Sequence, residues 1–416
     1  MNSANVSQSQ SSHTLRVLTW NANGLLSRKA ELAQFLNPEE VHIALISETH
    51  LNDRQHAKFK GYKMYVCNHP DNTSHGGAAV LIKENLCHYE IDNFRTQFIQ
   101  AACVAINFCG TQTTIAATYS PPKHPVTSTD YSMLFQHLGQ RWVAAGDWNA
   151  KHCYWGSRLT TTKGRQLYAA IQNANAICVS NGLPTYWPTD LNKQPDCIDF
   201  FIAKGIAANY MLARNYSDLS SDHSPIVMEL SGTVAARRPL MGLTNRRTNW
   251  DKFRDLLESQ INLQPKINTT SDIDEAVKAL IQQVADAAVA STPLIGRHSS
   301  KVNTYPKVIL EAVKNRRKLR HQWQSTRDPS VRGQFNRASR TAKSLISKAN
   351  NESFEEFILS LDATKNSNYS LYKVAKAARC PSIHVPPIRN AARNWARSEQ
   401  EKADTFAQHL VNVFYS

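Results

Sequence analysis

The sequence lacks the features that mark membrane and secreted proteins. It contains no apolar run of about 18 residues, the length from which a membrane-spanning helix is considered. Residues 1–13 are rich in Ser, Asn and Gln, without the apolar segment of a secretory signal. We therefore expect a soluble protein inside the cell, with no membrane partner and with residues 1–13 as a disordered leader.

The sequence also lacks paired cysteines. Its eight cysteines are scattered, and it contains no Cys-x-x-Cys motif or Cys/His cluster. This pattern argues against a zinc knuckle and against a disulfide framework. Most of the cysteines lie inside apolar runs such as Ala102-Cys103-Val104, so we expect buried free thiols.

Positive charge is scarce in the first half of the chain and abundant in the second. Residues 1–231 contain 18 basic and 17 acidic residues, whereas residues 232–416 contain 30 and 16. A near-neutral part therefore carries a basic extension, which we expect to meet a polyanion. The extension would supply non-specific binding, while the near-neutral part would carry the chemistry without it.

Short apolar runs bounded by turn residues recur along the first half, as is typical of strands. Strands are predicted at residues 15–21, 43–47, 62–67, 78–82, 101–108, 113–119, 143–147, 177–179, 197–203 and 226–230. Helical spacing is found only at 28–36, 131–138 and 164–174. Many strands with few helices between them predict an α/β fold, a four-layer sandwich of two packed mixed β-sheets flanked by helices.

After Gly232 the pattern becomes helical. Residues 250–263, 273–290 and 306–351 have helical spacing, with Pro293, Pro306 and Pro329 as breaks. We expect three parts: the leader 1–13, a folded domain at 14–231, and a basic α-helical extension at 232–416.

Polar residues gather at the predicted ends of strands. They are Asn21, Glu48, Tyr119, Asp147, Asn149, Asp199, Asp222 and His223. Hydrolysis of a phosphodiester needs a cation held by carboxylates, a base that activates water, and donors to the phosphate. Glu48 is the best metal ligand in this set, with Asp147 or Asp222 completing the site. His223 supplies an imidazole, and Asp199 could fix its tautomer.

Five stretches in order resemble the exonuclease III / apurinic endonuclease-like superfamily. They are Thr19-Trp20-Asn21-Ala22-Asn23-Gly24, Ile46-Ser47-Glu48-Thr49, Gly146-Asp147-Trp148-Asn149, Ile198-Asp199-Phe200 and Ser221-Asp222-His223-Ser224-Pro225. Within that superfamily, the Trp-Gly-Ser-Arg and Lys-Gly-Arg-Gln-Leu stretches at 155–158 and 163–167 are similar to the endonucleases of jockey-type non-LTR retrotransposons (LINEs). The tail is similar to the linker that precedes reverse transcriptase in such polyproteins.

The resemblance implies a role for each matching residue. The metal and water cluster would contain Asn21 and Glu48, with Asp222 beside the metal. Tyr119 would contact the phosphate, and Asp147 and Asn149 would orient the nucleophile and the leaving group. Asp199 and His223 would form the catalytic dyad. Asp147 and His223 are both candidates for the group that takes the proton.

Two stretches are candidates for contacts with DNA. The segment 185–196 corresponds to a hairpin that reaches into DNA in related endonucleases, and its candidate contacts are Tyr186, Trp187, Thr189 and Asn192. The basic run 314–320 contains Arg316, Arg317 and Lys318. This run could contact phosphates, serve as a nuclear-import patch or form a solvated helix face.

We expect an endonuclease dependent on Mg²⁺, with Mn²⁺ as the alternative ion, that nicks one strand of duplex DNA and leaves a 3′-hydroxyl. Element RNA is a second expected partner, through the basic tail. Synthesis would occur in the cytoplasm and action in the nucleus. The alternatives are a phosphatase of the same superfamily acting on inositol phosphates or lipid headgroups, and a decayed domain that only binds nucleic acid. The chain reaches Ser416 without a Tyr-Ala-Asp-Asp polymerase motif, so we expect no reverse transcriptase within it.

Overall fold

The structure, a computed structural model, describes residues 14–235, 244, 248–261, 268–293, 305–360, 372, 388–392, 394–396 and 399–414. The chain divides into two compact units, one made of residues 1–237 and 305–416 and the other of residues 238–304. The expected leader, residues 1–13, lies outside the described residues. Within the described part, none of the helices combines the length and apolar character needed to cross a membrane.

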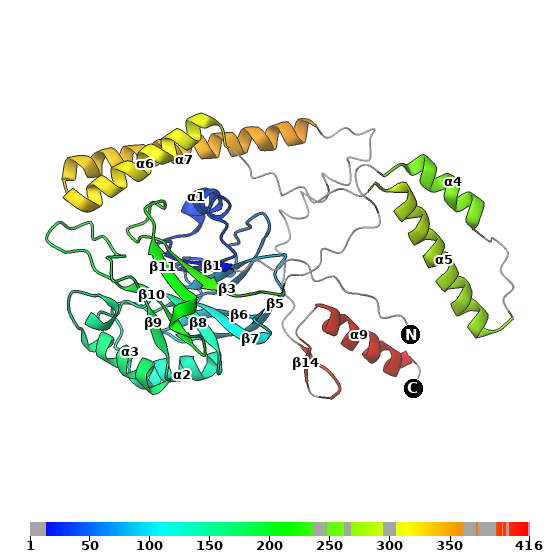
Figure 1. Cartoon of the computed structure of the whole chain (residues 1–416), viewed down its shortest axis with the longest axis horizontal. Helices are drawn as coiled ribbons and strands as arrows, with labels where there is room; N and C mark the ends of the chain where they lie inside the picture. The colour runs from blue at the N-terminus through cyan, green and yellow to red at the C-terminus, as the bar shows by residue number, and fades with distance from the viewer. Residues whose placement is uncertain are drawn as a thin grey trace. The chain divides into compact units, whose positions relative to one another are not determined.

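Two six-stranded mixed sheets form the centre of the first unit (Figure 1). The order in one sheet is β11 (Met211–Asn215), β12 (Ile226–Ser231), β1 (Thr14–Asn21), β2 (Ile43–Ser47), β4 (Ala78–Lys83) and β3 (Tyr62–Cys67). The order in the other is β5 (His88–Arg95), β6 (Gln100–Phe108), β7 (Thr111–Tyr119), β8 (Trp142–Asp147), β10 (Asp199–Lys204) and β9 (Ile177–Val179). Only the pairs β1/β2 and β7/β8 are parallel.

Apolar side chains fill the space between the sheets and cover their outer faces. Leu15, Val80 and Val104 belong to the inner cluster, which both sheets share. The helix α1 (Lys29–Leu36) packs on the outer face of the β1 sheet. The helices α2 (Ser128–Leu138) and α3 (Thr162–Asn173) pack on the outer face of the β8 sheet. The predicted four-layer α/β sandwich is therefore confirmed.

Two strands of the sandwich were missing from the sequence prediction. The strand β5 lies at the edge of its sheet, and β11 lies at the edge of the other. Most of their side chains are partly or fully exposed, so neither has the continuous apolar run on which the prediction depended. An edge strand covered on one side only has a weaker sequence signal than a central strand such as β8.

Strand register brings the polar strand ends together. Asp147 at the end of β8 lies beside Tyr119 at the end of the parallel strand β7. It also lies opposite Asp199, the first residue of the antiparallel strand β10. A Cβ atom at Gly146 would lie 1.7 Å from the Thr118 carbonyl oxygen, so only glycine lets these backbones approach so closely.

The long helices after the sandwich do not form one separate region. The second unit contains α4 (Trp250–Gln260) and α5 (Thr270–Ser291). By contrast, α6 (Lys307–Thr326) and α7 (Pro329–Leu359) belong to the unit of the sandwich and form a hairpin over α1 (Figure 1). The contacts thus group residues 305–416 with the sandwich, whereas the sequence placed a boundary at residue 231; a separate basic extension from 232 to 416 stays a prediction.

The remaining elements are short or lie near the end of the chain. They are the 3-10 helices η1 (Leu26–Arg28), η2 (Cys153–Trp155) and η3 (Ala208–Tyr210), the strands β13 (Ile388–Arg389) and β14 (Trp395–Ala396), and the helix α9 (Glu399–Phe414).

Candidate active site

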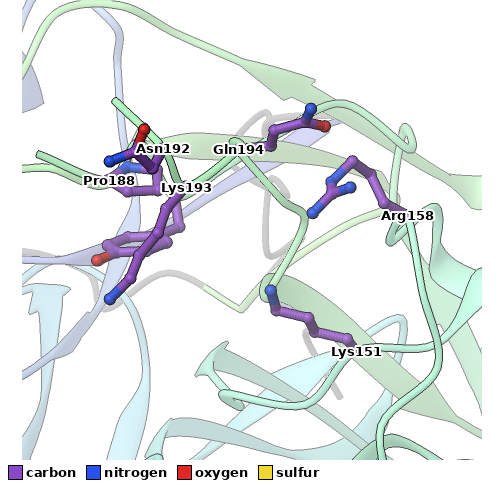
Figure 2. Close-up of a pocket in the computed structure, with 7 residues that line it drawn as sticks. Lys151, Arg158, Pro188, Asn192, Lys193 and Gln194 are labelled. Atoms are coloured by element: carbon purple, nitrogen blue, oxygen red, sulfur yellow. The ribbon is translucent and has the colours of Figure 1, made fainter. Parts of the chain in front are cut away.

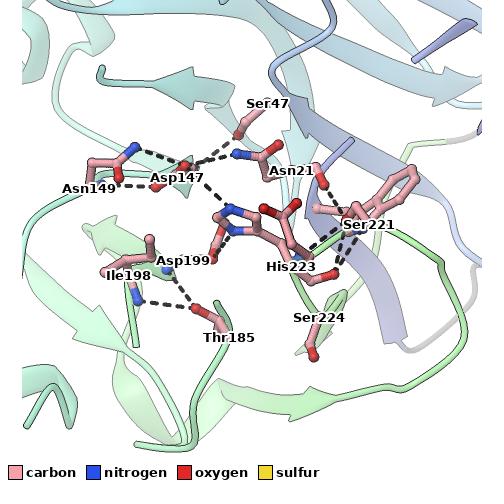
Figure 3. Close-up of polar contacts among 12 residues, drawn as sticks. Asn21, Ser47, Asp147, Asn149, Thr185, Ile198, Asp199, Ser221, His223 and Ser224 are labelled. Atoms are coloured by element: carbon pink, nitrogen blue, oxygen red, sulfur yellow. Dashed lines mark hydrogen bonds and ion pairs between the residues drawn. The ribbon is translucent and has the colours of Figure 1, made fainter. Parts of the chain in front are cut away.

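The candidate site lies where the loops after β1, β2 and β8 meet the start of β10 and the loop before β12 (Figure 3). Four of its residues have left-handed backbone conformations, with φ between 44° and 51°: Asn23, Glu48, His50 and Asn149. This region costs roughly 1–2 kcal/mol for a residue other than glycine, although asparagine tolerates it better. Such conformations cluster at functional sites.

Asp147 is held by two amides and a hydroxyl. Its Oδ2 atom accepts hydrogen bonds from Nδ2 of Asn21 at 2.8 Å and from Nδ2 of Asn149 at 2.9 Å (Figure 3). The Asp147 backbone N–H donates to the Ser47 hydroxyl, which itself donates to the Thr118 carbonyl. Ser47 could not be predicted as a site residue from the sequence, because a serine at a strand end has no signal of its own.

Asp199 and His223 form the predicted pair. Nδ1 of His223 lies 2.8 Å from Oδ2 of Asp199, and both residues are buried. Because a carboxylate accepts at Nδ1, that nitrogen carries a proton and Nε2 faces the other side. Nε2 lies 4.0 Å from Oδ2 of Asp147. Thr185, which the sequence analysis also missed, fixes Asp199 by accepting from its backbone N–H at 3.0 Å.

The buried charges shift the pKa values of both partners. Burial by itself lowers the pKa of His223, but the charge and hydrogen bond of Asp199 and the charge of Asp147 raise it to about 10. Burial, followed by the charge of Asp199, raises the pKa of Asp147 to about 8. Both groups therefore hold a proton more readily than the free side chains do.

The pKa of Glu48 is shifted in the opposite direction to that of Asp147. Burial raises its pKa, but hydrogen bonds from His50 and Asn21 and the charge of His223 bring it below the usual value. Oε2 of Glu48 lies 3.5 Å from Nε2 of His50, a residue to which the sequence analysis gave no role. Tyr119 has a raised pKa, because its hydroxyl is buried and lies near the charges of Glu48 and Asp147.

The crowded carboxylates fit a divalent cation. One donor atom from each of Asp147, Asp199 and His223 lies within 4.8 Å of the other two, and all three residues are buried. Oδ1 of Asp199 is buried without a hydrogen-bond partner in the described part of the chain. A cation would satisfy that oxygen and offset the repulsion that raises the pKa of Asp147.

This cluster differs from the metal set expected from the sequence. Of the described residues, Glu48 and Asp222 do not belong to the group within 4.8 Å. Asp222 instead accepts a hydrogen bond from Nδ2 of Asn23 at 3.2 Å. Asn21 uses its amide N–H on Asp147, and its oxygen accepts from the Asn23 backbone. Metal ligation by Glu48, Asn21 and Asp222 stays a prediction.

A basic pocket adjoins His223. Its volume is about 410 Å³, and it is lined by Lys151, Arg158, Tyr186, Pro188, Asn192, Lys193 and Gln194 (Figure 2). The Tyr186 ring contacts the His223 ring, with 4.9 Å between centroids. The Asp196 carboxylate lies 2.9 Å from Lys151 and 3.9 Å from Arg158, so one acidic residue stands against the three basic residues of the lining.

The other expected DNA contacts lie in different surroundings. Trp187 donates from Nε1 to the Ser224 hydroxyl at 3.1 Å, while Thr189 is exposed. Arg316 is only 1% exposed and forms an ion pair with Glu31, so its guanidinium is not available to DNA in this structure. Arg317 pairs with Asp218, and Lys318 is exposed.

The site residues all lie in a part of the chain that matches a known family. Residues 18–223 match the Endonuclease/Exonuclease/phosphatase family, and this part of the chain is a domain of that family.

Along its whole length, the chain is similar to the polymerases of mobile elements. It is 29% identical over 402 residues to the probable RNA-directed DNA polymerase from transposon X-element of Drosophila melanogaster, covering 96% of this chain and 44% of the relative. It is 30% identical over 406 residues to the probable RNA-directed DNA polymerase from transposon BS of the same organism, with the same coverage. The chain thus spans less than half the length of these relatives.

Among solved structures, the endonuclease domain of TRAS1, a telomere-specific non-LTR retrotransposon, is 22% identical, with a TM-score of 0.45. That match covers 52% of this chain and 98% of the TRAS1 domain. The AP endonuclease LMAP of Leishmania major is 13% identical, also with a TM-score of 0.45, and the match covers 53% of this chain and 88% of LMAP.

Proposed function

We propose that this chain is a divalent-metal-dependent endonuclease that nicks one strand of duplex DNA and leaves a 3′-hydroxyl. The observation that carries the proposal is the buried network of Asp199, His223 and Asp147 at the edge of a basic pocket. The relatives, which are named as polymerases of mobile elements, favour DNA as the substrate.

The pKa values favour Asp147 over His223 as the general base. A base works best when its pKa lies near the working pH, and the pKa of Asp147 is raised to about 8. His223, whose pKa is raised to about 10, is already protonated and suits the role of a donor to a phosphate oxygen. The amides of Asn21 and Asn149 keep the Asp147 carboxylate in place.

The oxygen donors of the site suit Mg²⁺, with Mn²⁺ as the alternative ion. A bound divalent ion would neutralise the charge that develops on the phosphate during hydrolysis. Asp199 Oδ1, which has no hydrogen-bond partner among the described residues, is the oxygen best placed to hold it, and the Asp147 carboxylate stays free to act as the base. Glu48, whose pKa is lowered by hydrogen bonds from His50 and Asn21, is the further candidate.

The pocket suits the DNA strand beside the cleavage site. Lys193 and Arg158 can contact phosphates, and Tyr186 offers a ring next to His223. Asn192 and Gln194 carry amides that can hydrogen-bond to base edges. If chromosomal DNA is the substrate, the protein acts in the nucleus, and the basic residues beyond the sandwich could also bind element RNA.

A supercoiled plasmid tests the proposal against its closest rival. We expect the purified full chain with Mg²⁺ to convert supercoiled plasmid into open circles and to release no phosphate from an inositol phosphate. Phosphate release without open circles would favour a phosphatase. Plasmid binding without nicking, in either Mg²⁺ or Mn²⁺, would indicate a domain that retains only nucleic-acid binding.

A further inference from the structure

Side chains from the hairpin of α6 and α7 donate hydrogen bonds to the main chain of the pocket-lining segment 186–194. Nη2 of Arg327 donates to the carbonyl of Pro188 at 3.0 Å and to the carbonyl of Lys193 at 3.4 Å. Nη1 of Arg332 donates to the carbonyl of Thr189 at 2.8 Å. Because these bonds use backbone oxygens, the side chains of the segment stay available to line the pocket.

An aromatic side chain holds both guanidinium groups in place. The Trp323 ring is buried, with the guanidinium carbon of Arg327 5.1 Å and that of Arg332 5.7 Å from its centroid. The ring of Phe335 stacks on Trp323 with an interplanar angle of 2°. Trp187, from the gripped segment itself, lies 6.2 Å from Trp323 between centroids. Packing of this kind limits where each arginine can point.

Helix α6 also contacts the loop that contains His223. Nη2 of Arg320 donates to the carbonyl of His223 at 3.0 Å, and Arg320 is buried. That carbonyl also accepts from Nε1 of Trp20 and from the Ser221 hydroxyl. The helical hairpin therefore contacts both the loop that contains His223 and the pocket-lining segment 186–194.

Arg327 lies in a backbone conformation that favours glycine. It follows the end of α6 with φ of 56°, where a left-handed residue closes the helix. Glycine would adopt this conformation at lower cost, so the turn itself does not require arginine. The side chain, with its two carbonyl contacts, has a role other than closing the helix.

We propose that Arg327 and Arg332 are positioning residues that set the shape of the basic pocket and thereby the sequences at which DNA is nicked. This inference rests on the proposed function, in which the pocket receives the DNA strand. The segment 186–194 has no strand partners beyond the bridges of Tyr186 to Asp196 and to His223 among the described residues. Without the two arginines it would sample many conformations, and its side chains would no longer present one pattern to the bases.

The experiment compares two single variants, their double variant and a control variant with the wild type, all as the full chain. Arg327→Gly removes the guanidinium without straining the turn, and Arg332→Ala removes the hydrogen bond to the Thr189 carbonyl. Arg337→Ala is the control, because Arg337 is exposed on the same helix α7 and its replacement removes the same charge as either single substitution. Amide hydrogen exchange of residues 186–194 is measured first, followed by the positions of nicks on plasmid DNA with Mg²⁺.

We expect exchange in 186–194 to become at least about tenfold faster in the Arg327→Gly, Arg332→Ala double variant, which reports local opening. The preference for favoured nick positions over average ones should fall by roughly fivefold or more, while Arg337→Ala matches the wild type in both measurements. A rate that falls with an unchanged pattern of nick positions would overturn the inference, and so would unchanged exchange. If the wild type itself nicks no DNA, the proposed function fails and the specificity role fails with it, whereas failure of the inference alone leaves wild-type nicking intact.

Discussion

Replacing Arg316 by methionine tests whether the α6–α7 hairpin is part of the folded domain. Nη1 of Arg316 lies 3.1 Å from Oε2 of Glu31, and both side chains are 1% exposed. Arg316 also donates to the Asp218 carbonyl. Methionine keeps much of the volume but leaves the Glu31 carboxylate buried without its cation. Removing one partner of a buried ion pair costs about 3–5 kcal/mol, so we expect a loss of that size in the free energy of unfolding.

Urea denaturation of the full chain gives the measurement, with the unfolding midpoint followed by fluorescence. Lys314→Met is the control, because Lys314 is exposed on the same helix and its replacement should change stability by less than about 0.5 kcal/mol. Adding Glu31→Gln to Arg316→Met should recover part of the loss, since no uncompensated charge is then buried. A loss below about 1 kcal/mol for Arg316→Met would refute the buried pair and with it the packing of the hairpin on α1.

Two further predictions concern catalysis and pH. Glu48→Ala and His223→Ala should each lower the nicking rate at least about a hundredfold without unfolding the protein. Near-normal cleavage by folded Glu48→Ala would show that Glu48 is not a metal ligand. Burial and then the charges of Lys83 and Arg16 lower the pKa of His42 from 6.5 to about 4. Its neutral form therefore contributes stability that is present above about pH 6.5 and lost as pH falls toward 4. Urea midpoints at pH 7 and 4.5 should differ less for His42→Asn than for the wild type, and equal differences would show that His42 is not responsible.

The sequence predicted the sandwich and the strand-end residues because each has a local signal. The apolar run that ends in Asp147 is a strand in the structure, and Asp199 and His223 meet as expected. Strand ends are visible in a sequence, and the register of neighbouring strands then brings their polar residues together. Ser47 and Thr185 were missed because their hydroxyls act on backbone groups of distant strands.

The surroundings of the basic run could not be predicted in the same way. Arg316 and Lys318 are both cations within a few residues of each other, yet one is buried and the other exposed. The difference depends on Glu31, which is 285 positions away along the chain. No local pattern marks a buried ion pair, because its two partners come together only when the helices pack.

The central claim is that the buried cluster hydrolyses DNA with Asp147 as the base, and Asp147→Asn tests it most directly. Asparagine has nearly the same shape as aspartate but cannot accept the proton. We expect the wild type to produce open plasmid circles with Mg²⁺ and none after chelation, with nicks that a polymerase extends without end repair. The folded Asp147→Asn variant should still bind plasmid but nick it at least about a hundredfold more slowly. Wild-type nicking that persists in a chelator, or an Asp147→Asn variant as active as the wild type, would contradict the account.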